Sequence, residues 1–254
     1  MNEIAYYPSL KDKVVLVTGG AAGIGESIVK NFLEQGSRVA FLDKDGTLGS
    51  KVVAKLNNFN HKALFKECDL VNISDLKDKI IEIQNELGPI SILVNNAGND
   101  ERHNMDDVTP DLWDNRMNIN LRHYFFASQS VYKDMKKIGK GSIINIGSYS
   151  WMINQGGMPG YTTAKSAIVG LTRTLARDLG THHIRVNCVV PGWIITKRQK
   201  ELWLTPEIEK DTISKQCIKR LLIPEDISRL VLFFASDQSS GISAQNYVVD
   251  GGIV

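Results

Sequence analysis

The fold is decided by the stretch Val14-Val15-Leu16-Val17-Thr18-Gly19-Gly20-Ala21-Ala22-Gly23-Ile24-Gly25. Its first four residues are an apolar run typical of a strand that is buried on both faces. Residues 26–35 follow with apolar side chains at helical spacing, and Gly36 stands where a glycine ends a helix. The stretch therefore predicts a strand, a glycine-rich turn and a helix in direct succession.

This order of elements is typical of a phosphate-binding site. Glycines let the backbone approach a pyrophosphate closely, and the free amides and positive dipole end of the helix stabilise its charge. We therefore expect Gly19, Gly23, Ile24 and Gly25 to contact a dinucleotide. The glycine spacing differs from the commonest dinucleotide fingerprint, so a plain tight turn stays open as the alternative.

An acidic residue indicates which dinucleotide the turn would bind. Residues 38–42 read as the second strand, and Asp43 follows it about twenty residues after the glycine turn. A carboxylate there accepts both ribose hydroxyls of NAD and repels the 2′-phosphate of NADP. Ala22 offers no positive charge to that phosphate, which also favours NAD. Lys44 keeps NADP open as the less favoured cofactor.

A second pattern predicts proton transfer. Tyr161 and Lys165 are four residues apart, so on a helix they share one face, with Ser148 thirteen residues before Tyr161. A nearby ammonium favours the phenolate and lowers the pKa of a tyrosine, which makes Tyr161 a candidate general base. Ser148 could hold the reacting oxygen by a hydrogen bond. An ordinary amphipathic helix is the alternative for the pair taken alone.

Short apolar runs alternate with longer helical patterns along the chain, which predicts an α/β fold. We read helices over residues 111–138 and from Tyr161 to about residue 180, and strands over residues 90–94, 142–146, 185–189 and 247–249. Right-handed crossovers then give one doubly wound Rossmann domain over residues 1–254, with a parallel sheet of about seven strands and helices on both faces. Residues 196–215 lie outside this frame and are the candidate lid over a substrate.

Composition limits the partners. The 254 residues include 30 basic and 28 acidic ones, a net charge of +2 with no long run of one sign, which does not indicate a nucleic-acid surface. Three scattered cysteines form no metal-ligand spacing and fit a reducing compartment. No apolar run approaches the roughly twenty residues that span a bilayer, and Met1 to Pro8 lack the apolar centre of a signal peptide. We therefore expect a cytoplasmic protein without membrane, nucleic-acid or metal partners.

Together these motifs resemble the short-chain dehydrogenase/reductase family, over essentially the whole chain. Further matches are Cys68-Asp69-Leu70, Asn95-Asn96-Ala97-Gly98, Asn118-Ile119-Asn120-Leu121 and Pro191-Gly192-Trp193-Ile194-Ile195-Thr196. The resemblance implies a catalytic set of Asn120, Ser148, Tyr161 and Lys165, and a homotetramer. It also implies that the cofactor contacts include Asp69, Leu70, Asn96, Ala97, Gly98, Tyr161, Lys165, Pro191, Gly192, Ile194 and Thr196.

The polar run Asn99-Asp100-Glu101-Arg102-His103 would lie at the rim of the reaction site, where a sugar needs hydrogen-bonding partners. The chain is most similar to the sugar 1-dehydrogenases of the D-xylose type. The resemblance is carried by this run together with Tyr7-Pro8-Ser9-Leu10-Lys11, Asn120-Leu121-Arg122-His123 and Thr196-Lys197-Arg198-Gln199. That similarity implies NAD-dependent oxidation of a pentose or deoxyhexose at C1 to the lactone. The expected substrate contacts are Asn99, Asp100, Arg102, His103, Ser148, Asn154 and Trp193.

Two other functions stay open. The same catalytic set could reduce another carbonyl substrate, such as a 3-oxoacyl thioester or a keto acid. The chain could also be a catalytically silent protein that senses nucleotides or acts as a scaffold.

Overall fold

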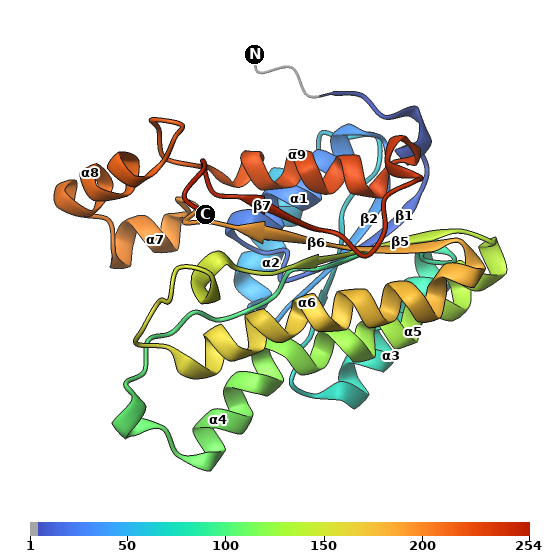
Figure 1. Ribbon diagram of the computed structural model, residues 1–254. Helices are drawn as coiled ribbons and strands as arrows, with labels where there is room; N and C mark the ends of the chain where they lie inside the picture. Colours follow the sequence, from blue (N-terminus) through green and yellow to red (C-terminus); the bar gives the residue numbers. More distant parts are fainter. Residues whose placement is uncertain (1–4) are drawn as a thin grey trace.

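A seven-stranded parallel sheet forms the centre of the molecule and is covered by helices on both faces (Figure 1). The computed structural model describes residues 5–254, so the amino-terminal segment considered above lies partly outside the described residues. The strands are ordered β3-β2-β1-β4-β5-β6-β7, and each neighbouring pair is parallel. The predicted doubly wound Rossmann fold is therefore confirmed.

The strands are β1 Val14–Thr18, β2 Arg38–Asp43, β3 Leu64–Glu67, β4 Ile92–Asn95, β5 Gly141–Ile146, β6 Ile184–Pro191 and β7 Asn246–Val249. The helices are α1 Gly23–Glu34, α2 Gly46–Lys55, α3 Ile73–Leu87, α4 Pro110–Met117, α5 His123–Ile138, α6 Pro159–Leu179, α7 Lys197–Leu202, α8 Pro206–Lys215 and α9 Pro224–Ala235. The predicted helical region 111–138 is divided into α4 and α5 by a π-helical segment, Asn118–Arg122.

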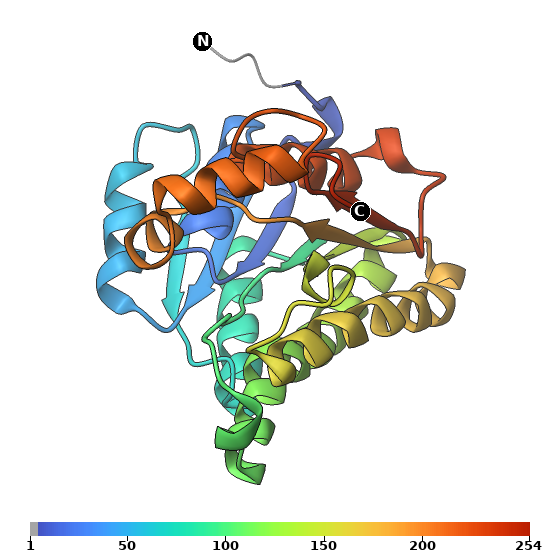
Figure 2. The ribbon, with the colours of Figure 1, turned by 60° about the vertical axis from the view of Figure 1, so that its left-hand side comes forward.

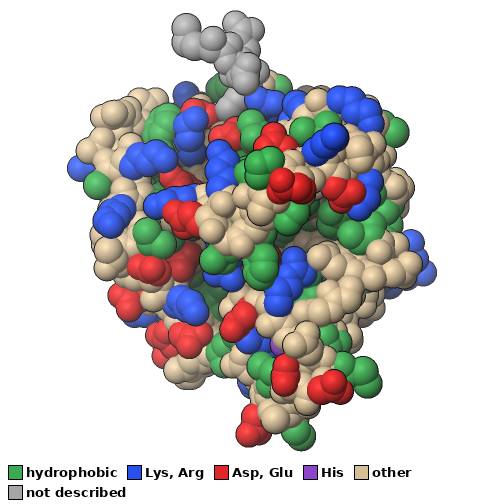
Figure 3. Space-filling view, turned by 90° about the vertical axis from the view of Figure 1, so that its left-hand side faces the viewer, with side chains coloured by type: hydrophobic (Ala, Val, Ile, Leu, Met, Phe, Trp, Pro, Cys, Tyr) green, Lys and Arg blue, Asp and Glu red, His purple; other side chains and the backbone are tan. Residues whose placement is uncertain are grey.

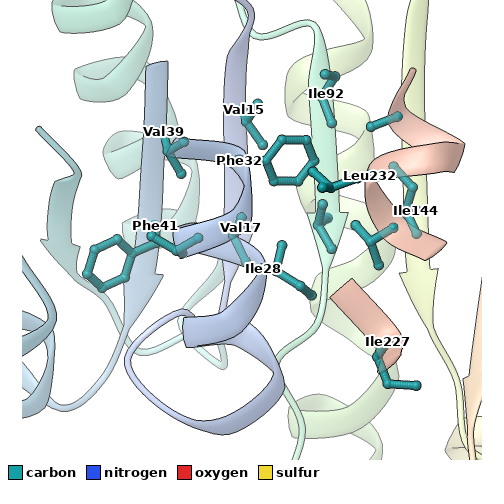
Figure 4. Packing of buried hydrophobic residues seen from close by; sticks show 14 of the residues in the cluster. Val15, Val17, Ile28, Phe32, Val39, Phe41, Ile92, Ile144, Ile227 and Leu232 are labelled. Carbon is teal, nitrogen blue, oxygen red and sulfur yellow. The ribbon is translucent and has the colours of Figure 1, made fainter. Parts of the chain in front are cut away.

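Each face of the sheet packs on its own layer of helices. Val15 and Val17 of β1 point to one face, where they join α1 and α9 in a cluster that includes Ile28, Phe32 and Leu232 (Figure 4). The alternate residues Val14 and Leu16 point to the other face, against α3, α5 and α6. All five residues of β1 are buried, because alternation along a strand directs successive side chains into the two separate cores.

The carboxyl ends of the strands lie on one side of the molecule, and α7 and α8 project beyond them (Figures 1 and 2). The space-filling view onto this side shows a hollow between hydrophobic and basic side chains (Figure 3). In open α/β sheets, ligands bind outside the carboxyl ends of the strands. No helix within residues 5–254 is long and apolar enough to cross a membrane.

Candidate active site

The glycine turn between β1 and α1 has a backbone that other residues could not easily adopt. Gly19 and Gly23 have φ of +68° and +58°, in the left-handed region that glycine tolerates. A Cβ added at Gly25 would lie 1.9 Å from the Gly19 carbonyl oxygen. The turn therefore packs tightly at the amino-terminal end of α1, and this cradle of backbone amides fits a pyrophosphate.

Asp43 is held beside this turn. Its carboxylate accepts a hydrogen bond from the Ala21 amide at 3.0 Å and another from the Asp45 amide at 3.2 Å. At the end of the next strand, the Asp69 carboxylate accepts from the Val71 amide at 3.1 Å, and Leu70 packs into the core. The predicted adenosine-side residues thus lie along the carboxyl ends of β2 and β3.

Asn96 joins the end of β4 to the glycine turn. Its side-chain amide donates to the carbonyl oxygens of Thr18 and Gly19 at 3.0 and 2.9 Å. The Thr18 hydroxyl in turn accepts from the amides of Asn96 and Ala97. These contacts make two chain segments about eighty residues apart into one rigid edge.

A cavity of about 450 Å³ opens beside this edge. It brings together thirteen of the predicted residues. They are Ile24, Asn96, Gly98, Asp100, Arg102, Ser148, Tyr161, Lys165, Pro191, Gly192, Trp193, Ile194 and Thr196. The motifs from β1, β4, β5, α6 and β6 therefore converge on one space.

Tyr161 lies in the first turn of α6, where the helix dipole favours negative charge. Burial raises the pKa of Tyr161 to about 12, while a hydrogen bond with Ser148 acts to lower it. This differs from the lowered pKa that the Tyr161–Lys165 spacing predicts. The reason is that burial outweighs the favourable contacts, and that the Lys165 ammonium is 5.8 Å from the centre of the tyrosine ring and bonded elsewhere.

Lys165 is almost completely buried, with 3 % of its surface exposed. Its Nζ donates to the Ile146 carbonyl oxygen at 2.9 Å and to the Tyr124 hydroxyl at 3.0 Å. Burial lowers the pKa of Lys165 to about 8. The ammonium thus lies at the floor of the cavity, where a Cβ at Gly98 would come within 3.2 Å of it.

Asn120 lies in the π-helical segment and its side chain is fully buried. Its Oδ1 accepts from the Asn99 amide at 2.8 Å, and its Nδ2 donates to the carbonyl oxygens of Asn99 and Arg116. The side chain is therefore occupied in holding the loop after β4. A π-helical turn is a frequent feature of functional sites.

Three of the predicted substrate residues do not line the cavity. The backbone of Asn99 binds Asn120, and Asn154 is exposed on a left-handed turn with φ of 55°. His103 is buried with both ring nitrogens engaged: Nε2 accepts from the Gly160 amide at 3.1 Å, and Nδ1 lies 3.0 Å from the Glu101 carbonyl oxygen. Because both ring nitrogens contact backbone groups, His103 holds the start of α6 in place and does not face a ligand.

Side chains from α7 close one side of the cavity. Gln199 donates to the Asp100 carboxylate at 2.9 Å and accepts from the Trp193 indole at 2.7 Å. The Arg102 guanidinium lies 5.4 Å from the centre of the Trp203 ring, at a cation–π distance. The candidate lid is thereby tied to Asp100 and Arg102, two polar residues of the loop after β4.

Comparison with known proteins agrees with this geometry. A family model described as Enoyl-(Acyl carrier protein) reductase matches residues 19–254, nearly the whole chain. The chain belongs to the short-chain dehydrogenase/reductase family. It is therefore an oxidoreductase, and its fold is the one common to that family.

Two curated relatives of this dehydrogenase are named for sugars. D-xylose 1-dehydrogenase from Caulobacter vibrioides is 46 % identical over 98 % of both chains. The "Probable galactose dehydrogenase GalD" of Rhizobium meliloti is 42 % identical over 97 % of both chains. A crystal structure of a protein from Sinorhizobium meliloti 1021, described as a short-chain alcohol dehydrogenase, has a TM-score of 0.91 at 27 % identity and covers 97 % of this chain and 98 % of its own.

Two residues at the site of this dehydrogenase were assigned no individual role from the sequence. Tyr124 contacts Lys165 but reads as an ordinary aromatic residue in a helix. Gln199 lies in the candidate lid, yet its contact with Asp100 spans 99 positions. No local pattern marks either residue, because both act through partners that are distant in sequence.

Proposed function

We propose that this protein oxidises an aldose at C1 to the lactone with NAD. The observation that carries the proposal is the placement of Asp100, Arg102 and Gln155 in the same cavity as Ser148 and Tyr161. A sugar that leaves water must keep a hydrogen bond for each hydroxyl, and these side chains supply donors and acceptors. The sugar substrates in the names of two close relatives support this choice.

The dinucleotide would be held along the carboxyl ends of the strands. The proposed contacts are the backbone of Gly19, Gly23, Ile24 and Gly25, then Asp43, Asp69, Leu70, Asn96, Ala97 and Gly98, and on the nicotinamide side Tyr161, Lys165, Pro191, Gly192, Ile194 and Thr196. When bound, NAD supplies the acceptor for the hydride that leaves C1. Asp43 favours NAD over NADP because its negative charge opposes a 2′-phosphate.

Tyr161 is the proposed general base. It would take the proton from the anomeric hydroxyl. Burial raises its pKa to about 12, and the Ser148 hydrogen bond, the amino-terminal end of α6, the charge of Lys165 and the positive charge of a bound nicotinamide would each act to lower it again. Ser148 donates a hydrogen bond to the same oxygen as the carbonyl forms. Both Nδ2 hydrogens of Asn120 are used by backbone carbonyls, but its Oδ1 keeps a second lone pair, which would hold a water on the route by which protons return to solvent.

The polar side of the cavity would orient the sugar ring. Arg102 can be held by Gln155, whose amide oxygen lies 2.9 Å from Nη1 in the orientation that satisfies both groups. Trp193 offers a flat apolar face, and its indole is fixed by Gln199. The lid over residues 196–215, the homotetramer and the cytoplasmic location stay predictions. The molar mass of the purified protein in solution, measured by light scattering, tests whether it is a tetramer.

A second candidate is reduction of another carbonyl substrate. A relative from Chlamydia pneumoniae named as a 3-oxoacyl-[acyl-carrier-protein] reductase, 34 % identical over 96 % of this chain, favours it. Such an enzyme would prefer an acyl thioester to a sugar. An apolar acyl chain in the cavity would bury the charged Asp100 and Arg102 without giving them hydrogen-bonding partners, which would weaken its binding.

The decisive experiment measures NADH formation by the purified protein against D-xylose, L-arabinose, L-fucose, L-rhamnose, D-glucose and D-galactose. NAD and NADP are compared side by side, and an acyl thioester with NADH or NADPH tests reduction. We expect saturable turnover of one or two aldoses with NAD. No turnover of any aldose, with NAD binding intact, would reject the sugar assignment.

A further inference from the structure

Tyr124 on α5 is completely buried, and its ring packs with Ile168, Cys188 and Val190. Its hydroxyl does not reach the cavity but meets the Lys165 ammonium from behind, at 3.0 Å. The same hydroxyl lies 2.9 Å from the Ile146 carbonyl oxygen and 3.3 Å from the Ala97 carbonyl oxygen. A tyrosine outside the predicted catalytic set is thus in direct contact with one of its members.

The number of hydrogens on each group indicates which group donates and which accepts in this contact. A phenol has one hydrogen, and the nearer acceptor for it is the Ile146 carbonyl oxygen. A lone pair of the hydroxyl is then available to accept from Lys165. Lys165 also donates to Ile146 directly, so the three groups form a triangle. An ammonium has three donors, and this triangle uses two of them.

We propose that Tyr124 is a positioning residue, whose hydroxyl holds Lys165 in its charged form and at the level of Tyr161. The inference rests on the proposed function, in which the charge of Lys165 makes Tyr161 a base. Tyr124 acts through Lys165 alone and touches neither the reacting atoms nor the cavity.

The other titratable groups around Lys165 do not take over the proposed role of Tyr124, which is to hold Lys165 in its charged form. On α5, burial and the charge of Lys165 lower the pKa of His123 to about 3, so this ring is neutral. On β6, burial raises the pKa of the Cys188 thiol to about 12, so it carries no charge at neutral pH. Burial lowers the pKa of Lys165 to about 8 and outweighs the effects of Cys188 and of Asp100, on the loop after β4, which both act to raise it.

Loss of the hydroxyl should therefore change the pH dependence of turnover. Without this acceptor the charged form of Lys165 is less stable, so its pKa falls below about 8 and Lys165 loses its charge at a lower pH. The weaker positive charge also stabilises the Tyr161 phenolate less. The ratio of kcat in the variant to kcat in the wild type should therefore decline as the pH rises through neutrality.

The test is Tyr124→Phe, which keeps the ring and its packing. We expect kcat near neutral pH to fall roughly tenfold, the effect of losing one hydrogen bond to a charged group, with the KM for NAD within about twofold. The control is Ser128→Ala. It removes a buried hydroxyl one turn along α5, which donates to the Tyr124 carbonyl oxygen and does not contact Lys165. That variant should keep the pH profile of the wild type.

A second measurement does not depend on turnover. Lysine labelled with carbon-13 at Cε is titrated by NMR, and the signal of Lys165 is identified by its loss in Lys165→Met. We expect Lys165 to titrate at a lower pH in Tyr124→Phe than in the wild type and in Ser128→Ala. A fall in kcat with an unchanged Lys165 titration would overturn the inference, because it would show a merely structural effect.

The two proposals can fail separately. Turnover of aldoses with the pH profile unchanged in Tyr124→Phe rejects the positioning role and leaves the proposed function. A shifted Lys165 titration in a protein that oxidises no aldose rejects the proposed substrate, while it supports the contact between Tyr124 and Lys165.

Discussion

The Asp43 carboxylate accepts a hydrogen bond from the Ala21 amide at 3.0 Å, although the two residues are 22 positions apart. This contact fixes the acidic side chain beside the glycine turn, where the adenosine ribose of the proposed cofactor would lie. The position of the charge, and not only its presence in the sequence, therefore supports the proposed preference for NAD.

Asp43→Asn should shift the cofactor preference. The amide keeps an oxygen that can accept from Ala21, but it no longer repels a 2′-phosphate, so we expect the ratio of kcat/KM for NAD over NADP to fall at least tenfold. Asp45→Asn is the matched control, because asparagine also caps α2 at this position. A ratio that is unchanged in Asp43→Asn would contradict the role of the charge.

Tyr161→Phe should abolish most of the chemistry while the dinucleotide still binds. Loss of a positioned general base costs about 100- to 10,000-fold in kcat, and the phenyl ring keeps the packing in the first turn of α6. The measurements are NADH formation and NAD binding by calorimetry. Tyr132→Phe, on α5, controls for loss of a phenol elsewhere. Turnover near the wild-type rate in Tyr161→Phe would rule out the proposed base.

Lys165→Met should make the protein more stable near neutral pH even as it loses activity. Burial lowers the pKa of Lys165 to about 8, so a charged Lys165 costs roughly 3 kcal/mol below that pH. Because Ile146 and Tyr124 lose a donor in the variant, we expect a net gain of about 1–2 kcal/mol.

The size of this stability difference depends on pH. Below about pH 8, Lys165 is protonated in both the folded and the unfolded state, so burial of its charge lowers the free energy of unfolding by the whole amount. Between pH 8 and the unfolded pKa of about 10.4, the unfolded state binds more protons, so the wild type gains stability as pH rises. The advantage of Lys165→Met in thermal unfolding should therefore shrink over this range. Lys62→Met, at an exposed position, should show no such trend.

Gln199→Ala should loosen the candidate lid. The side chain joins Asp100 to Trp193, so its loss weakens the attachment of α7 to the loop after β4 and to the proposed sugar face, although the Arg198–Asp100 ion pair at 3.6 Å remains. We expect the KM for the aldose to rise about three- to tenfold, with a smaller change in kcat and in NAD binding. Lys200→Ala, an exposed neighbour on α7, is the control. Equal KM values in the two variants would contradict a lid held by Gln199.

Local sequence determined the elements that depend on neighbouring residues. The apolar run before Gly19 defines β1, and glycine at positions 19 and 23 allows the left-handed backbone of the turn. Tyr161 and Lys165 share a helix face because a helix brings residues four apart together. Composition and alternating patterns sufficed for the class of fold, since parallel strands buried on both faces leave a plain apolar signature.

The tertiary structure decided how the distant segments meet. His103 and Arg102 are adjacent and polar, yet Arg102 lines the cavity while His103 binds the Gly160 amide at the start of α6. Whether Lys165 bonds to Tyr161 or to Tyr124 depends on how α5 packs against α6 and β5, which the four-residue spacing does not specify. Burial is likewise a property of the packed molecule, and it raises the pKa of Tyr161 where the spacing alone predicts a lowered one.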